Sequence, residues 1–278
     1  MRAAAVQVAT TFDAAENRRL VSDRIGAAAR AGAHLVVLPE ATMCTFGGPS
    51  FDLAAVAEPL DGPFFDAVRT GAARHGLTVV AGMFERSARA GRAFNTVVVA
   101  GPVGELLGAY RKLHLFDALG AMESARLDSG DPESGLVTFE VGGMVAGIMT
   151  CYDLRFPEMA RALVDRGAEL LVLPAHWYSG PGKPEVWATL VRARAIESTA
   201  YVVAAGKPAP EGVGRSVIVD PMGEVCAALG EDDDDCAVAD VEASRVAEVR
   251  RVLPVLEHRR FDVVARVPGA RPGHEPSA

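Results

Sequence analysis

The sequence predicts an α/β protein in which buried strands alternate with amphipathic helices. Short apolar runs recur along the 278 residues, and segments with apolar residues at helical spacing separate them. Residues 32–39 are echoed by residues 167–174, and each run begins with Gly-Ala and ends with Leu-Pro. Each of these runs follows a helical segment. We therefore expect two related halves of one sheet system rather than two domains.

Each expected element follows from its own pattern. Residues 13–31 carry Leu20, Val21, Ile25 and Ala28 at helical spacing and stop at Gly32. The expected helices are 13–31, 63–75, 157–167, 183–200 and 242–252. The expected strands are 3–8, 34–38, 77–84, 94–100, 106–115, 136–141, 145–150, 169–173, 201–205, 216–219 and 237–241.

The remaining stretches are polar or rich in proline and glycine. Residues 86–92 are expected to form a hairpin, and residues 118–133 a loop. Residues 1–267 are predicted to form a single domain. Residues 268–278 are rich in proline and glycine, which indicates a disordered tail.

Composition narrows the possible functions. The net charge of −8 argues against nucleic acid or an anionic membrane as a partner. No apolar run is long enough to span a bilayer, and the strand-like start is too short for a signal peptide. The four cysteines show neither Cys-x-x-Cys pairing nor zinc spacing, so we expect reduced thiols in a cytoplasmic protein without a bound metal.

Cys151 stands where an apolar strand passes into a helix. Residues 145–150 are apolar, and Pro157 suits the first position of the following helix. The turn therefore places a sulfur at the mouth of a sheet, beside backbone N–H groups that stabilise a thiolate or an oxyanion. A small buried hydrophobe is the alternative, because most free cysteines are inert.

Two charged residues also follow buried strands. Glu40 ends an apolar strand, where burial is expected to raise its pKa toward that of a general base; a helix cap or surface glutamate is the alternative. Lys112 and His114 are expected on one face of a strand, where Lys112 is either functional or simply solvated. Together with Cys151, these residues supply the nucleophile, base and oxyanion donor of acyl transfer.

Five motifs in order give the chain a resemblance to the carbon–nitrogen hydrolase (nitrilase) superfamily. They are Leu38-Pro39-Glu40, Tyr110-Arg111-Lys112-Leu113-His114-Leu115-Phe116-Asp117, Cys151-Tyr152-Asp153-Leu154-Arg155-Phe156-Pro157-Glu158, Arg192-Ala193-Arg194-Ala195-Ile196-Glu197 and residues 216–223. The resemblance implies a four-layer α-β-β-α sandwich and a triad of Glu40, Lys112 and Cys151. Glu123 matches a second family glutamate that orients the lysine or assists a proton transfer.

The resemblance also implies a mechanism and a branch. Glu40 takes the thiol proton, Cys151 attacks the amide carbon, and Lys112 with the Tyr152 N–H holds the oxyanion. A thioester forms and water hydrolyses it, so no cofactor is needed. The residues after the cysteine resemble the amidase branch that includes omega-amidase and deaminated glutathione amidase. Two positions depart from the family pattern: Arg215 replaces a histidine and Met222 replaces a tryptophan.

Three further residues are candidates for contact with the substrate. Arg155 is suited to grip a substrate carboxylate through two hydrogen bonds, or it braces the turn by pairing with Asp153 or Glu158. Trp177 follows the second Leu-Pro and is expected to wall the pocket, with core or dimer packing as the alternative. Phe46, which follows Glu40, is interpreted in the same way.

The leading prediction is a small-molecule amidase that releases ammonia. An N-carbamoyl amidase or ureidopropionase is the second candidate, and a non-catalytic scaffold is the third. A papain-like protease using Cys151 and a histidine lacks a supporting signature around the cysteine. The apolar segment at residues 252–256 resembles the family's exchanged arm, which predicts a homodimer or larger homo-oligomer.

Overall fold

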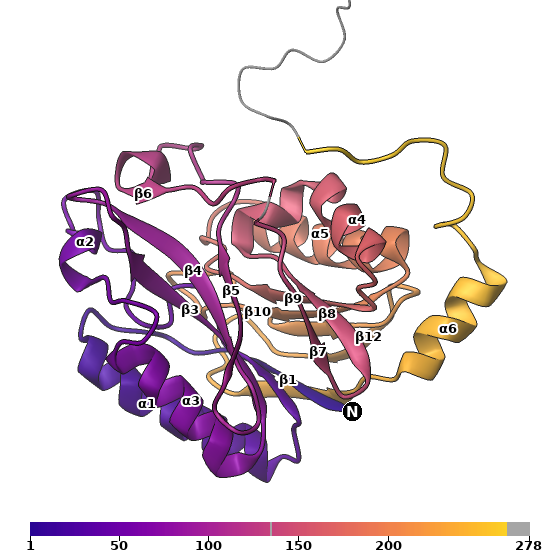
Figure 1. Cartoon of the computed structure of the whole chain (residues 1–278), viewed down its shortest axis with the longest axis horizontal. Helices are drawn as coiled ribbons and strands as arrows, with labels where there is room; N and C mark the ends of the chain where they lie inside the picture. Colours follow the sequence, from indigo (N-terminus) through magenta and orange to yellow (C-terminus); the bar gives the residue numbers. More distant parts are fainter. Residues whose placement is uncertain (134, 266–278) are drawn as a thin grey trace, which may run out of the picture.

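The computed structural model describes residues 1–133 and 135–265, which build two β-sheets lying face to face (Figure 1). The first sheet has the strand order β13 (Cys236–Asp240), β1 (Arg2–Val6), β2 (Leu35–Val37), β3 (Thr78–Arg86), β4 (Ala93–Ala100) and β5 (Leu106–Arg111), with β6 (Leu127–Asp128) paired to β4. The second has the order β12 (Val225–Ala228), β11 (Val217–Val219), β10 (Tyr201–Ala205), β9 (Leu170–Pro174), β8 (Met144–Ile148) and β7 (Thr138–Val141).

The two sheets share one plan, as the sequence echo predicts. Strands β1, β2 and β3 run parallel in the first sheet, and β8, β9 and β10 run parallel in the second. The echoed runs supply β2 and β9, which lie at the middle of these parallel triplets. The remaining strands pair antiparallel with their neighbours, apart from β6, which runs parallel to β4.

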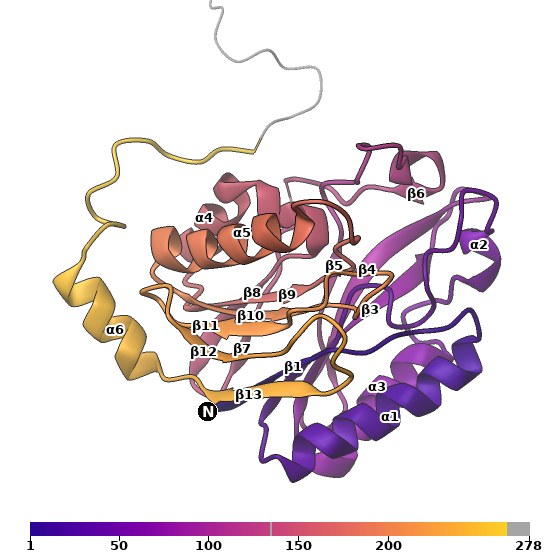
Figure 2. The ribbon, with the colours of Figure 1, turned by 180° about the vertical axis from the view of Figure 1, so that it is seen from behind.

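Helices cover the outer face of each sheet, so the molecule has four layers (Figures 1 and 2). Helices α1 (Ala14–Arg30) and α3 (Pro63–His75) cover the first sheet, and α4 (Pro157–Asp165) and α5 (Lys183–Ser198) cover the second. Side chains alternate along each inner strand: Ala3 and Ala5 face the second sheet, whereas Ala4 and Val6 face the helices. The predicted α-β-β-α sandwich is confirmed.

Several short elements differ from the sequence prediction. The stretch predicted as a loop at 118–133 contains the 3₁₀ turn η1 (Glu123–Ala125) and strand β6. Helix α2 (Leu53–Val56) and strand β12 carry little apolar periodicity and were not expected. Strand β5 ends at Arg111 rather than at residue 115, so Lys112 and His114 do not share a strand face.

The C-terminal part runs outward from the sandwich. Helix α6 (Ala243–Val252) follows β13, and the chain after it extends past α4 (Figure 1). The predicted tail, 268–278, lies outside the described residues. No helix in the described part of the chain combines the length and apolar character needed to cross a bilayer.

Candidate active site

Cys151 occupies a strained turn between β8 and α4. It is the first residue of the 3₁₀ turn η2 (Cys151–Arg155), and its φ of 47° is left-handed, a conformation that costs a non-glycine residue energy. Thr150 and Asp153 cap the turn reciprocally, and the Thr150 N–H donates to Asp153 Oδ2 at 2.9 Å. Pro157 begins α4, as predicted.

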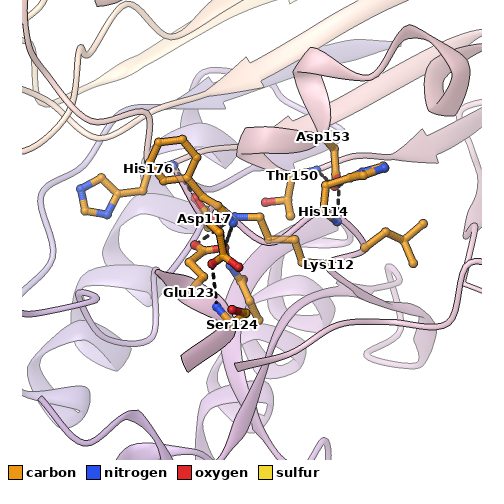
Figure 3. A network of polar contacts seen from close by, with 12 residues as sticks. Lys112, His114, Asp117, Glu123, Ser124, Thr150, Asp153 and His176 are labelled. Atoms are coloured by element: carbon orange, nitrogen blue, oxygen red, sulfur yellow. Dashed lines mark hydrogen bonds and ion pairs between the residues drawn. The ribbon is translucent and has the colours of Figure 1, made fainter. Parts of the chain in front are cut away.

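The buried carboxylate of Asp153 holds this turn in place. It is fully buried and accepts a hydrogen bond from the Tyr110 hydroxyl at 2.6 Å, and its Oδ1 lies 2.7 Å from His114 Nδ1. The His114 ring stacks on Phe156 with centroids 3.7 Å apart. Figure 3 shows Asp153, Thr150 and His114 together beside Lys112. Because each partner comes from the other sheet or the same turn, the network fixes where Cys151 stands.

Glu40 lies just beyond β2 and is 1% exposed. Its Oε1 accepts hydrogen bonds from Asn95 Nδ2 at 2.7 Å and from Lys112 Nζ at 2.9 Å. Its Oε2 accepts the backbone N–H of His176, beyond β9, at 2.8 Å. The carboxylate is therefore held by groups from both sheets. This satisfies a buried charge that would otherwise be costly.

Lys112 stands between two carboxylates. Its Nζ lies 2.9 Å from Glu40 Oε1 and 3.0 Å from Glu123 Oε2, and its side chain is fully buried (Figure 3). The Phe116 N–H donates to Glu123 Oε2 at 2.8 Å and fixes that carboxylate in turn. Burial lowers the pKa of Lys112, but the charges of Glu123 and Glu40 more than offset it, so the pKa lies well above its usual range. The lysine is therefore an ammonium.

The acid–base state of the cluster differs from two expectations. Burial raises the pKa of Glu40, but Lys112 opposes it and the net pKa is lowered, so the expectation of a raised value is wrong. Burial and then Glu40 raise the pKa of Cys151 well above 9, so the lysine does not yield a resting thiolate. Burial also raises the pKa of Glu123. The site thus pairs an ionised Glu40 with a neutral thiol.

A pocket opens beside these groups. Its lining contains seven of the eight predicted site residues: Glu40, Phe46, Glu123, Cys151, Tyr152, Arg155 and Trp177. The eighth, Lys112, lies behind the wall with no exposed surface. The structure therefore brings together residues that are more than 130 positions apart in the sequence.

Two cations stand at the wall of this pocket. The Arg155 guanidinium lies 5.1 Å from the centroid of the Trp177 ring, and Lys183 Nζ lies 5.5 Å from the same ring. Burial and the charge of Arg155 lower the pKa of Lys183. Neither cation forms an ion pair in residues 1–133 and 135–265, so the expected alternative for Arg155, a brace to Asp153 or Glu158, is not seen.

The two departures from the family pattern lie away from the pocket. Arg215 pairs with Glu185 at 3.3 Å and with Glu231 at 2.8 Å, and Met222 is half exposed. Neither side chain belongs to the pocket lining. Arg215 therefore adds no positive charge to the lining of this pocket.

Several residues around the site were not singled out from the sequence. Asn95 and the following Thr96 interrupt a strand that is apolar elsewhere, and that interruption is the signal that the sequence offers. His176 has no second histidine at metal-ligand spacing, so the sequence gives it no ligand role. Lys183 begins α5 and resembled an ordinary helix residue. Phe116 also lines the pocket wall, and so does Tyr178, which the sequence groups with Trp177 after the second Leu-Pro.

Comparison with known sequences extends over most of the chain. The family described as carbon-nitrogen hydrolase matches residues 2–251. A protein of Mycobacterium tuberculosis named only as a hydrolase is 42% identical over 275 residues, covering 93% of this chain and 95% of the relative. A deaminated glutathione amidase of Escherichia coli O157:H7 is 41% identical over 261 residues, covering 94% of this chain and 98% of the relative.

Comparison with solved structures gives the same picture. The NitFhit protein of C. elegans matches with a TM-score of 0.85 and 29% identity, over 93% of this chain and 65% of that longer chain. A mutant amidase of Nesterenkonia sp. AN1 in complex with acrylamide matches with a TM-score of 0.80 and 26% identity, over 94% of each chain. Another structure of that amidase has acrylamide added to its active-site cysteine.

Proposed function

Because the chain belongs to the carbon–nitrogen hydrolase family, we propose that Cys151, Glu40 and Lys112 hydrolyse a small carboxamide to a carboxylate and ammonia. Family membership confirms the predicted class of enzyme, a hydrolase of C–N bonds that acts on amides. The observation that carries the assignment of residues is the buried Lys112 ammonium, which contacts two carboxylates beside a cysteine at the pocket.

The first half of the reaction forms a thioester. Glu40 accepts the proton of the Cys151 thiol as the sulfur attacks the amide carbon, because the carboxylate is ionised and the thiol is not. Negative charge develops on the amide oxygen, where Lys112 and the Tyr152 N–H stabilise it. The C–N bond then breaks, and Glu40 returns its proton to the departing ammonia.

The second half repeats these roles with water. Glu40 removes a proton from a water molecule, which attacks the thioester carbonyl. The C–S bond breaks, the carboxylic acid leaves, and the proton restores the thiol of Cys151. Glu123 holds Lys112 in place throughout, through the contact at 3.0 Å. No step requires a metal or an organic cofactor.

The pocket wall favours an amide that carries a carboxylate away from the scissile bond. Arg155 and Lys183 present two positive charges next to Trp177 without a carboxylate partner in the described residues. A bound carboxylate relieves the repulsion between these cations, and Arg155 is suited to bind it through two parallel hydrogen bonds. Tyr152, Phe46 and Trp177 then enclose the carbon chain.

An ammonia-release screen tests this function. The panel contains monoamides of dicarboxylic acids, neutral aliphatic amides, N-carbamoyl amino acids, nitriles and deaminated glutathione, for which the Escherichia coli relative is named. We expect ammonia from the acidic monoamides, without carbon dioxide, and none from the Cys151→Ala variant. Carbon dioxide released with the ammonia indicates the N-carbamoyl amidase instead. No turnover of any panel member by the folded protein contradicts the amidase and favours the scaffold.

Arg155→Lys separates recognition of the carboxylate from chemistry. The change keeps the positive charge and removes the planar fork, so KM for acidic amides rises while kcat is nearly kept. Neutral amides serve as the internal control, because they have no group for Arg155 to bind. Equal changes in KM for acidic and neutral amides contradict the proposed role.

The assembly and the compartment are proposals as well. Exposed apolar side chains follow α6, which supports a homodimer or larger homo-oligomer. The four cysteines are free thiols, which supports a reducing compartment and therefore the cytoplasm.

A further inference from the structure

Lys207 is a buried cation that the reaction above does not use. It follows β10 in the second sheet, and its side chain is 1% exposed. The chain contains 25 arginines and only three lysines, Lys112, Lys183 and Lys207. Lys112 and Lys183 belong to the centre and the wall of the pocket. The third lysine is therefore the one whose role is unexplained.

The ammonium of Lys207 binds the turn that carries Glu40. Its Nζ donates to the carbonyl of Ala41 at 3.1 Å and to the hydroxyl of Thr10. The Thr10 hydroxyl also lies 3.4 Å from the same carbonyl. Lys207 thus reaches from the second sheet to the residue that directly follows Glu40 in the first.

The turn after Glu40 has a strained backbone that contacts from other parts of the chain must stabilise. Ala41 has a φ of 52°, which is left-handed and unfavourable for a residue with a side chain. Strand β3 presses against it from the other side, since a Cβ on Gly82 would lie 2.6 Å from the Ala41 nitrogen. The direction of the Glu40 side chain depends on this strained backbone, so a contact at Ala41 acts on the general base.

Stability alone does not account for a lysine at this place. Burial lowers the pKa of Lys207 to about 8, although Glu211, Glu40 and Cys44 oppose the shift. In the described residues Lys207 forms no ion pair, and the nearby His176 ring is neutral because its own pKa is about 3. A buried charge with only neutral hydrogen-bond partners costs stability, which a methionine of similar length avoids.

We propose that Lys207 is a positioning residue for the general base, which fixes the Glu40–Ala41 peptide and places a second positive charge behind the Glu40 carboxylate. The proposal rests on the proposed role of Glu40 as the base. Lys207 acts through Glu40 and does not touch the substrate, because it lies outside the pocket lining.

The role predicts two separate effects of Lys207→Met. The Glu40 carboxylate is misplaced, and a displacement of about 1 Å costs roughly 10²-fold in rate. The loss of a nearby cation also makes Glu40 easier to protonate, so the acid limb of the pH profile moves upward. A purely structural residue lowers thermal stability without moving the limb.

Alkylation of Cys151 by iodoacetamide measures both effects without a known substrate. The rate is followed by peptide mass spectrometry from pH 4 to 9 in the wild type, Glu40→Gln, Lys207→Met and the double variant. We expect at least tenfold slower alkylation in Lys207→Met at pH 7 and a shifted acid limb. In the Glu40→Gln background, Lys207→Met should change the rate by less than about twofold, because the group it positions is already gone.

Two further variants control for folding. Arg250→Met also removes a cation that binds backbone carbonyls, those of Thr199 and Ala168, and should lower the melting temperature without changing alkylation. If Lys207→Met does not fold, Lys207→Gln takes its place. The amide removes the charge, so the limb still shifts, and it keeps a donor for the Ala41 carbonyl, so the rate partly recovers.

The outcomes separate this inference from the proposed function. An acid limb that disappears in Glu40→Gln, with unchanged alkylation and pH limb in Lys207→Met or Lys207→Gln, overturns the role of Lys207 and leaves Glu40 as the base. An acid limb that stays in place in Glu40→Gln removes Glu40 as the base, and the role of Lys207 fails with it.

Discussion

At the scale of residues, one ammonium nitrogen links the two carboxylates at the centre of the site. Lys112 Nζ is shared between Glu40 and Glu123, at 2.9 and 3.0 Å, and the Lys112 side chain is fully buried. The pKa of Glu40 lies below the ordinary value of a glutamate, whereas the pKa of Glu123 lies above it. Such a split is typical of a base and an acid in one site. Each residue here is therefore sensitive to a change of shape as well as charge.

Lys112→Arg should reduce turnover by roughly 10²–10³-fold, because a planar guanidinium cannot take the place of a compact ammonium at an oxyanion site. Steady-state ammonia release measures the loss, and circular dichroism checks the fold. The neighbouring Arg111→Lys is the matched control, since Arg111 pairs with Glu85 outside the pocket. Lys112→Arg with wild-type turnover would falsify the role of Lys112.

His176 should make the free energy of unfolding depend on pH. Burial lowers its pKa from 6.5 to about 3, so it stays neutral in the folded protein while the unfolded chain protonates below pH 6.5. The unfolded state then binds more protons, and stability falls as pH falls from 6.5 toward 3. The expected slope from this residue is about 1.4 kcal/mol per pH unit.

Urea unfolding at pH 6.5 and 5.5 measures this slope. His176→Phe keeps the ring between Phe46 and Tyr178 and should remove about 1 kcal/mol of the pH-dependent loss. His75→Gln is the control, because His75 is exposed at the end of α3. If the His176 variant and the wild type lose equal stability between the two pH values, the buried neutral histidine is contradicted.

At the scale of elements, the site is assembled from strand ends. Glu40 follows β2, Lys112 follows β5, Cys151 follows β8 and Lys207 follows β10. Strand β3 closely approaches the turn after β2 at Gly82, so both elements fix the position of Glu40, the proposed base. An added Cβ there would meet the Glu40 Cα at 2.8 Å.

Gly82→Ala should therefore lower both stability and turnover. Overpacking against backbone costs about 1–3 kcal/mol, and displacement of Glu40 costs roughly 10²-fold in kcat. Thermal unfolding and ammonia release are measured together. Gly76→Ala is the control: it has a φ of 65° but open space around its Cα, so it should lose stability alone. Wild-type kcat in Gly82→Ala contradicts the coupling between β3 and the base.

Long apolar runs made the main elements predictable, and interruptions of those runs revealed part of the site. Cys151 and Glu40 each end an apolar strand, so both can be recognised from the sequence. Strand β12 is largely exposed and carries no clear alternation, so its sequence pattern is too weak to predict a strand. The raised pKa of the thiol depends on two carboxylates, and Glu123 lies near it only after folding. Lys207 gave no signal, because a lysine after a strand is usually solvated.

At the scale of the whole molecule, the C-terminal segment leaves apolar surface uncovered. Val252 is 61% exposed, Phe261 89% and Val264 82%. We expect at least a dimer at micromolar concentration by light scattering, because surface of this kind is usually an interface. Phe261→Glu with Val264→Glu should shift the mass toward the monomer. Val103→Glu, at an apolar site that is 79% exposed elsewhere, is the control. A monomeric mass for the wild type contradicts the expected assembly.

Because the chain has only three lysines, isotopically labelled lysine can serve as a spectroscopic probe of the proposed active site. Isotopic enrichment of lysine side chains adds only three ammonium or methylene resonances to an NMR spectrum of 278 residues, and all three arise around the pocket. Lys112 reports on the paired carboxylates and Lys183 on occupancy of the wall. Lys207, with a pKa of about 8, changes its chemical shift in a range where Lys112 remains an ammonium. One titration therefore follows the centre, the wall and the support of the base separately.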